Sequence, residues 1–267
     1  LDQRFPTDWE QLEIPTPEFI GNRVIESQSL ETLRDFIDWT PFFMTWQLKG
    51  KYPRIFNHPE LGAPAQELFD HAQQLLDRII TEQRFQATAV YGFWPANSVD
   101  DEILIYTDES RSQQHAVFQA LRQQTRRKGQ DHFRSLADYV APVASGRADY
   151  IGAFALTTGK GVAELVAEYE AKQDDYNSIM VKALADRLAE AFAEFLHLQT
   201  RQQWGYGVSE DLSSEALIAE QYRGIRPAPG YPAQPDHTEK LAIWELLDVV
   251  ESTGITLTES LAMFPAA

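Results

Sequence analysis

The sequence contains no cysteine, which excludes disulfide bonds and thiolate metal ligands. It has no run of about 18 apolar residues, so we expect no membrane-spanning helix. Basic residues are few, 23 against 40 acidic ones, and the formal net charge is −17. A field of this sign repels phosphate backbones, so we expect no nucleic-acid partner. The N-terminus resembles neither a signal peptide nor a transit peptide, and with the missing cysteine this favours a cytoplasmic protein.

Generic catalytic patterns are also missing. There is no Gly-x-Ser-x-Gly, His-Glu-x-x-His or Gly-x-Gly-x-x-Gly. Residues 157–161 have the wrong spacing for a phosphate-binding loop, and we interpret them as a turn at a helix start. Glu194 and His197 have the i,i+3 spacing of di-iron bundles but no matching pair elsewhere, so we predict no metal site. The residues alone favour a ligand-binding domain without catalytic residues of its own.

The chain has enough hydrophobic residues, 43% of 267, to bury a sizeable core. No composition break marks a linker, so we predict one α+β domain over residues 1–267, with an antiparallel sheet of short strands covered by long helices. Residues 1–27 lack periodicity and are expected to form an irregular arm. Periodicity predicts helices over 30–37, 64–84, 162–199 with a break near 173, 215–222 and 239–250, and strands over 87–94, 102–106, 149–156 and 255–258. Residues 95–98 are predicted to turn the chain.

One stretch, residues 226–232, contains three prolines and can be neither a helix interior nor a central strand. We predict a stiff, extended loop with Arg226 at its entrance, and with backbone groups that find few partners inside it. Two interpretations remain open. The loop is a rigid connector between helices, or it is a small-molecule clamp in which Arg226 pairs with a carboxylate and the backbone reads a planar ring.

Asp38 is a lone carboxylate in the aromatic segment 37–46. A carboxylate in such surroundings needs a cation or several hydrogen-bond donors. We place it at the C-terminal end of the preceding helix, where the helix dipole disfavours it. A structural hydrogen bond and a ligand contact remain equally open for Asp38. A second charged feature, the basic run 122–128, is interpreted as a solvated turn.

Several stretches resemble the C-terminal activation domain of cobalamin-dependent methionine synthase. They are residues 37–46, 149–155, 174–197, 224–232 and 237–240, and the resemblance covers nearly all of residues 25–267. The resemblance implies a single C-shaped α+β domain around a twisted antiparallel sheet. It also implies that the domain binds S-adenosylmethionine and supplies the methyl group for reductive remethylation of cob(II)alamin in methionine biosynthesis.

Carried over by motif, Asp38 would bind the amino group of S-adenosylmethionine and Arg226 its carboxylate. The backbone around Ala228, Gly230 and Tyr231 would hold the adenosine, while Glu190 and Glu220 match acidic residues that line the family's site. Cobalamin would be carried by the neighbouring domain and not by this chain alone. Flavodoxin or a similar reductase would supply the electron, and the basic run 122–128 is a candidate contact for it. The chain would be part of a methyltransferase and not catalytic alone.

Members of this family continue beyond the position of Ala267 with a Ser-Gly-Trp-Tyr-Phe segment and a later tyrosine pair that contacts the ligand. We therefore expect the C-terminal end of the family domain to be missing here. The alternative function is a stand-alone binding or interaction protein with the same fold and an incomplete site. Remethylation of cob(II)alamin in the presence of the cobalamin module would distinguish the two.

Overall fold

The computed structural model describes residues 4–126, 128–208, 210 and 212–265. Its main sheet is antiparallel and is organised around strand β2 (Gln86–Val99). One edge of β2 pairs along its length with β5 (Asp149–Lys160). The other edge pairs first with β1 (Gly21–Gln28) and then with β3 (Glu102–Tyr106), which in turn pairs with β4 (Gln114–Gln119). A separate small ladder joins β6 (Thr256–Leu257) to β7 (Met263–Phe264).

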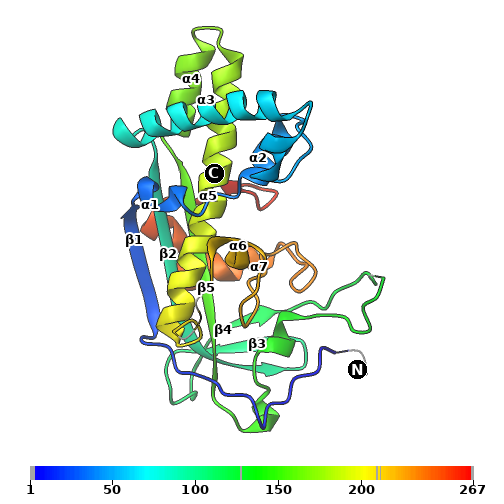
Figure 1. Ribbon diagram of the computed structural model, residues 1–267. Helices are drawn as coiled ribbons and strands as arrows, with labels where there is room; N and C mark the ends of the chain where they lie inside the picture. The colour runs from blue at the N-terminus through cyan, green and yellow to red at the C-terminus, as the bar shows by residue number, and fades with distance from the viewer. Residues whose placement is uncertain (1–3, 127, 209, 211, 266–267) are drawn as a thin grey trace.

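The helices surround the long strands, as Figure 1 shows. The longest, α5, runs beside the sheet, and α4 folds back against it at one end of the molecule. Their bounds are α1 (Leu30–Arg34), α2 (Trp39–Thr45), α3 (Gly62–Thr81), α4 (Val162–Glu170), α5 (Asp175–Trp204), α6 (Ser214–Ile218), α7 (Glu239–Leu247) and α8 (Val249–Thr253). Short 3₁₀ turns cover Arg54–Asn57, Leu136–Tyr139 and Val143–Ser145.

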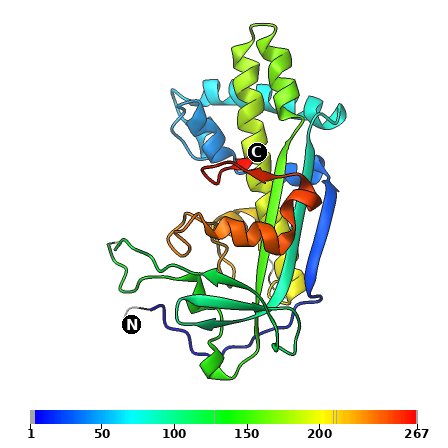
Figure 2. The same cartoon turned by 180° about the vertical axis from the view of Figure 1, so that it is seen from behind.

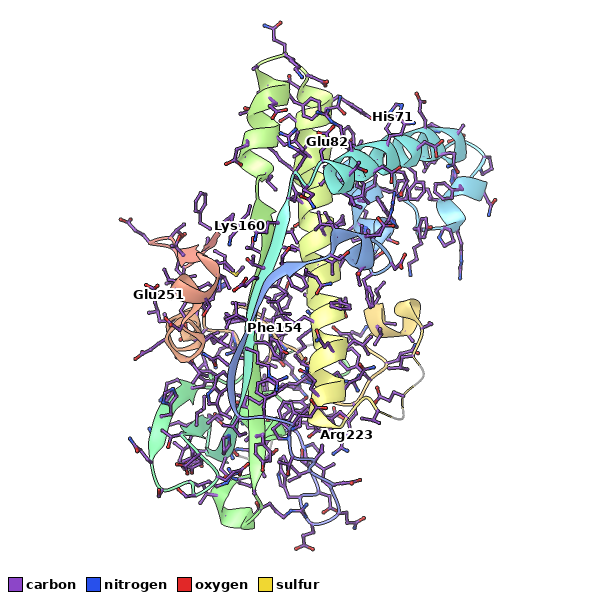
Figure 3. The ribbon with its side chains drawn as sticks, turned by 90° about the vertical axis from the view of Figure 1, so that its left-hand side faces the viewer. His71, Glu82, Phe154, Lys160, Arg223 and Glu251 are labelled. Carbon is purple, nitrogen blue, oxygen red and sulfur yellow. The ribbon has the colours of Figure 1, made fainter. Side chains whose placement is uncertain are left out.

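The two faces of the sheet carry separate hydrophobic cores. On β2, Ala89, Tyr91 and Phe93 belong to the core under α3 and α5, while the intervening side chains belong to the core with β3, α7 and α8. Alternate residues of a strand point to opposite faces, so the near-continuous apolar run of β2 is explained by burial on both sides. Figure 3 shows this layering, with α5 on one side of the strands and the segment carrying Glu251 on the other.

The N-terminal arm crosses the lower end of the molecule in Figure 1. Arg147 fixes it by donating to the carbonyl oxygens of Trp9 at 2.9 Å and Leu12 at 2.7 Å. The Trp204 indole donates to the Pro15 carbonyl at 3.2 Å. Seen from behind in Figure 2, the α2 region and the β3–β4 region project to the same side of the long strands, which gives the domain its C shape.

The predicted α+β class is confirmed, and α5 begins at the predicted break. The expected arm over residues 1–27 is wrong at its end, because residues 21–28 form β1. The predicted turn at 95–98 is also wrong, since these residues continue β2. Pro95 falls between the last β1 pairing, at Phe93, and the first β3 pairing, at Ala96, an interruption where a missing N–H is tolerated. Likewise residues 157–160 extend β5, and the turn is confined to Gly161.

Candidate ligand-binding site

The Pro-rich segment 226–232 folds into a turn that is closed by its own hydrogen bonds. The Gly230 N–H donates to the Gln234 carbonyl at 2.8 Å, and the Tyr231 N–H donates to the Ala228 carbonyl at 3.2 Å. The Leu136 N–H donates to the Ala233 carbonyl at 2.8 Å and so fixes the turn to the body. Among the described backbone hydrogen bonds, one lies within residues 226–232, and the others of this turn go to Gln234, so the expectation of few partners inside the loop is confirmed.

Position 230 favours glycine for two reasons, its positive φ and the lack of space for a Cβ atom. Its φ is +104°, and a Cβ at this position would lie 2.4 Å from Cε1 of His237. The His237 ring therefore supports the turn from behind, and only glycine fits in front of it. Ala228 and Tyr231 are exposed on the same turn, with Tyr231 at 63%. The backbone of residues 228–231 is thus held rigid at the surface.

Arg226 connects this turn to α5. Its Nη2 pairs with Glu194 of α5, and the two side chains are only 21% and 16% exposed. The Nε of Arg226 is buried and has no hydrogen-bond partner among the described residues. Burial raises the pKa of the Tyr222 hydroxyl, and the charge of nearby Arg226 and a hydrogen bond with it offset part of this rise. The guanidinium is therefore held, but not all of its donors are used.

Acidic side chains surround this arginine. Burial raises the pKa of Glu194, the charge of Arg226 opposes this, and the neighbouring charges of Glu190 and Glu220 add to it. Glu190 and Glu220 are exposed. Arg226 and Glu220, which are six residues apart, are thus brought next to Glu190 of α5. One guanidinium among three carboxylates leaves the region net negative, which favours a ligand that carries both a carboxylate and positive charge.

Beneath the arginine, His197 and Arg201 continue along α5. Burial, assisted by the charges of Arg226 and Arg201, lowers the pKa of His197 to about 3. The centroids of its ring and the Tyr222 ring are 4.8 Å apart in an edge-to-face arrangement, and the Arg201 guanidinium lies over the Tyr222 ring, 4.7 Å from its centroid. Glu194 faces Arg226 and His197 faces Tyr222, so the i,i+3 pair does not build a metal site. No group of three or more metal-ligating side chains occurs within the described residues.

Asp38 occupies a different place from the one predicted. It is the N-cap of α2 and accepts a hydrogen bond from the Thr40 N–H at 2.9 Å, so the helix dipole favours its charge. The expected position at a helix C-terminus was wrong, because α1 ends at Arg34. Phe36 packs against Phe195 of α5 at 5.4 Å, which brings this segment next to Glu194. Among the described residues, Asp38 forms no hydrogen bond or ion pair with Arg226.

Two hollows lie away from this site. The larger, of about 700 Å³, lies after α2 and is lined by Met44, Gln47, Lys49, Gly50 and Lys51. The smaller, of about 180 Å³, lies under the N-terminal arm. Neither is lined by the acidic residues around Arg226. We place the candidate site at Arg226 because charge and a rigid backbone converge there.

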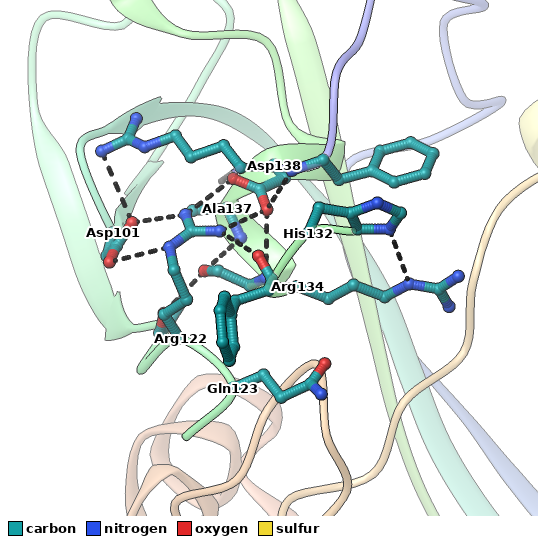
Figure 4. Close-up of polar contacts among 12 residues, drawn as sticks. Asp101, Arg122, Gln123, His132, Arg134, Ala137 and Asp138 are labelled. Carbon is teal, nitrogen blue, oxygen red and sulfur yellow. Dashed lines mark hydrogen bonds and ion pairs between the residues drawn. The ribbon is translucent and has the colours of Figure 1, made fainter. Parts of the chain in front are cut away.

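The basic run 122–128 was interpreted as a solvated turn, and for its first residue this is wrong. Arg122 is 17% exposed and forms ion pairs with Asp101 and Asp138, each at 2.6 Å. These contacts, drawn in Figure 4, raise the pKa of Arg122 further above its ordinary value, with the hydrogen bond to Asp138 as the main cause. Arg126 and Lys128 are exposed as predicted, and Arg127 lies outside the described residues.

Fold and site together define a class of protein: a C-shaped α+β domain with a candidate ligand-binding surface formed by a rigid proline turn and one long helix. Comparison with known proteins identifies the family. The profile described as "Vitamin B12 dependent methionine synthase, activation domain" matches residues 29–267, and the chain belongs to this family. A crystal structure of the MetH reactivation domain bound to AdoHcy is 54% identical in sequence, with a TM-score of 0.92, over 99% of this chain and 81% of that chain.

The family resemblance predicted from the sequence is thereby confirmed. The site contains residues that the sequence reasoning did not assign to it, chiefly Glu194 and Tyr222. The spacing offers a weak signal for each, because Glu194 follows Glu190 by one helical turn and Tyr222 precedes Arg226 by four residues. No helix in the described part of the chain is long and apolar enough to cross a membrane.

Proposed function

We propose that this chain binds S-adenosylmethionine and presents it to cobalamin on a neighbouring domain during reactivation of methionine synthase. Family membership and the relative with bound AdoHcy support the ligand class. The observation that carries the proposal is Arg226, a largely buried guanidinium at the entrance of a rigid turn, which lies among the carboxylates of Glu194, Glu190 and Glu220. A ligand carboxylate fits such a group, because a planar guanidinium offers paired donors.

The remaining site residues take complementary roles. Asp38 binds the amino group of the ligand, since a capping carboxylate keeps acceptor capacity beyond its bond to Thr40. The backbone of Ala228, Gly230 and Tyr231 binds the adenosine, and its rigidity lowers the entropy lost on binding. Glu190 and Glu220 provide negative charge near the sulfonium. When bound, S-adenosylmethionine supplies the methyl group for reduced cobalamin.

In this proposal the chain contributes binding and orientation, and no side chain acts as an acid or base. Alone it is not catalytic, and activity belongs to the methyltransferase of which the family is a part. The proposed partners are the cobalamin domain and an electron donor, flavodoxin or a similar reductase, in the cytoplasm. With Arg122 engaged in internal ion pairs, any role of the run 122–128 in binding a reductase falls to Arg126 and Lys128.

The first test is calorimetric titration with S-adenosylmethionine. We expect saturable binding by the wild-type chain and a loss of about tenfold or more in affinity for Arg226→Ala, because one charge-assisted interaction contributes about 1.5–3 kcal/mol. Arg223→Ala is the matched control, since Arg223 lies three residues earlier, donates to the Glu13 carbonyl and packs over Tyr206. No binding by the folded wild-type chain would overturn the proposal.

A second test separates a reactivation module from a binding protein. Supplied with the cobalamin module, a reductant and S-adenosylmethionine, the wild-type chain should support remethylation of cob(II)alamin, followed by its absorption spectrum. Arg226→Ala should slow this at subsaturating ligand. A chain that binds the ligand but gives no remethylation would retain only the binding half of the proposal.

A further inference from the structure

Arg226 pairs with Glu194 and lies near Tyr222, two side chains to which the family comparison assigns no role. We propose that Glu194 and Tyr222 are positioning residues that fix the guanidinium of Arg226, so that its remaining N–H groups face the ligand carboxylate. The inference rests on the proposed function, because it concerns how the site distinguishes a ligand with a carboxylate from one without. It assigns selectivity to two residues that do not touch the ligand.

Glu194 fixes the guanidinium from α5. It pairs with Nη2 of Arg226, and its neighbours Phe192 and Leu196 are fully buried in the core. Burial of these neighbours locks the rotation of α5 about its own axis, so Glu194 has a defined direction. A charge-assisted bond from a fixed carboxylate restricts a flexible arginine far more than water would.

Tyr222 fixes the guanidinium from the chain that enters the loop. Its ring contacts the ring of His197, with centroids 4.8 Å apart, and the guanidinium of Arg201, 4.7 Å from the ring centroid. Arg201 is itself 4% exposed and donates twice to Glu210, at 2.7 and 2.8 Å. Its Nη2 is held by both carboxylate oxygens of Glu210, while Nε and Nη1 have no partner among the described residues, so the support of Tyr222 rests on this ion pair and on the ring contact. The tyrosine is therefore placed by two independent contacts.

The geometry has a chemical consequence. A guanidinium carries five N–H donors in one plane, so its rotation decides which of them a carboxylate meets. Glu194 occupies Nη2, and Nε is buried without a partner among the described residues. A fixed plane favours a carboxylate that approaches in that plane. An arginine released from Glu194 or Tyr222 keeps its charge but spends most of its time in other orientations, so selectivity falls more than affinity for the rest of the ligand.

Binding of two ligands to the wild-type chain and its variants tests this. The probes are S-adenosylmethionine and decarboxylated S-adenosylmethionine, which keeps the adenosine, the sulfonium and the amine but lacks the carboxylate. The Kd of the decarboxylated probe divided by the Kd of S-adenosylmethionine measures how strongly the site recognises the carboxylate. We expect this ratio to fall about fivefold in Glu194→Ala and Tyr222→Phe, with the Kd of the decarboxylated probe changed less than about twofold, as for loss of one hydrogen bond. Glu194→Gln, which keeps an acceptor oxygen, should recover part of the ratio.

Controls separate this inference from the function on which it rests. Glu190 is exposed and lies one helical turn before Glu194. Glu190→Ala should weaken the binding of both probes by the same factor, because the Glu190 carboxylate acts on the sulfonium that both probes carry. Arg226→Ala should bring the ratio close to one. Circular dichroism and thermal melting establish that each variant is folded.

Each outcome is decisive. If wild-type chain binds S-adenosylmethionine and Arg226→Ala lowers the ratio, but Glu194→Ala and Tyr222→Phe leave it unchanged or weaken both probes equally, the positioning role is overturned while the proposed function stands. Tighter binding of S-adenosylmethionine by Glu194→Ala would also overturn it, because Glu194 would then compete with the ligand. Absence of binding by the wild-type chain overturns both proposals.

Discussion

Arg122 and Arg226 both lie beside acidic groups, yet their surroundings differ. Arg122 uses its donors on Asp101, Asp138 and the Phe133 carbonyl, and its main partner Asp138 is 3% exposed (Figure 4). Arg226 pairs with Glu194 on a turn at the surface and retains a buried donor without a partner among the described residues. Arg122, whose donors are all bonded within the protein, contributes to folding, whereas Arg226 lies on a surface turn among acidic side chains, where we propose that it meets a ligand.

The largest expected effect concerns Arg122. Arg122→Met removes the cation from the buried carboxylate of Asp138, which also accepts from the Ser135 N–H at 3.1 Å. Breaking a buried pair in this way costs about 3–5 kcal/mol, so urea unfolding should show a large loss of stability. Affinity for S-adenosylmethionine should stay within about twofold at a temperature where the variant is folded. A loss of affinity equal to that of an Arg226 variant would remove the distinction between the two arginines.

The reverse pattern is expected for Arg226→Met. Ligand affinity should fall about 10- to 100-fold, since a charge-assisted contact contributes about 1.5–3 kcal/mol. The free energy of unfolding should fall by less than for Arg122→Met, because burial already raises the pKa of Glu194, which can take up a proton once Arg226 is gone. Calorimetry and urea unfolding on the same preparation check both halves. A large loss of stability with unchanged affinity would reverse the assignment.

The sequence specified much of this arrangement, but not all of it. Period-2 and period-3.6 patterns located β3, β5, α3 and α5, since those segments bury a continuous apolar face. The edge strands β1 and β4 have burial on one side only and a mixed composition, so the pattern was too weak to find them. Pro95 was misread as a turn because its tolerance depends on where two partner strands end, and that is not encoded locally.

The candidate site shows the same limit. The motif that carries Arg226, Gly230 and Tyr231 was visible, since proline and glycine constrain the backbone locally. Pairing of Arg226 with Glu194 depends on which helix lies across from the loop, and in sequence Glu190 had an equal claim. Asp38 was predicted at a helix C-terminus and lies at a helix N-terminus, because α1 ends three residues before its predicted boundary and α2 begins after Asp38.

A smaller effect is expected at Gly230. Gly230→Ala places a Cβ against the His237 ring and forces alanine to φ +104°. Strain of this kind costs about 1–3 kcal/mol locally, and since the turn lies at the surface we expect about 1–2 kcal/mol of lost stability. Adenosine should bind more weakly, because the backbone of residues 228–231 shifts. The double variant with His237→Ala relieves the clash but not the φ strain, so it should recover only part of the loss, measured by thermal unfolding and adenosine titration.

The smallest effect concerns how far acid destabilises the fold through His197. This histidine is buried close to Arg226. Its native pKa is about 3, lowered by burial and by Arg226 and Arg201, and its unfolded value is about 6.5. Between these values the unfolded chain binds more protons, so stability falls as the pH drops below about 6.5, by at most about 1.4 kcal/mol per pH unit. By pH 5.5 this amounts to about 1 kcal/mol, which His197→Asn should remove. His115→Asn, at an exposed position on β4, is the control. The difference in unfolding free energy between pH 7 and 5.5 could be the same in wild type and His197→Asn. The histidine would then not be held neutral in the folded protein, and Arg226 and Arg201 would not form the charged support of Tyr222.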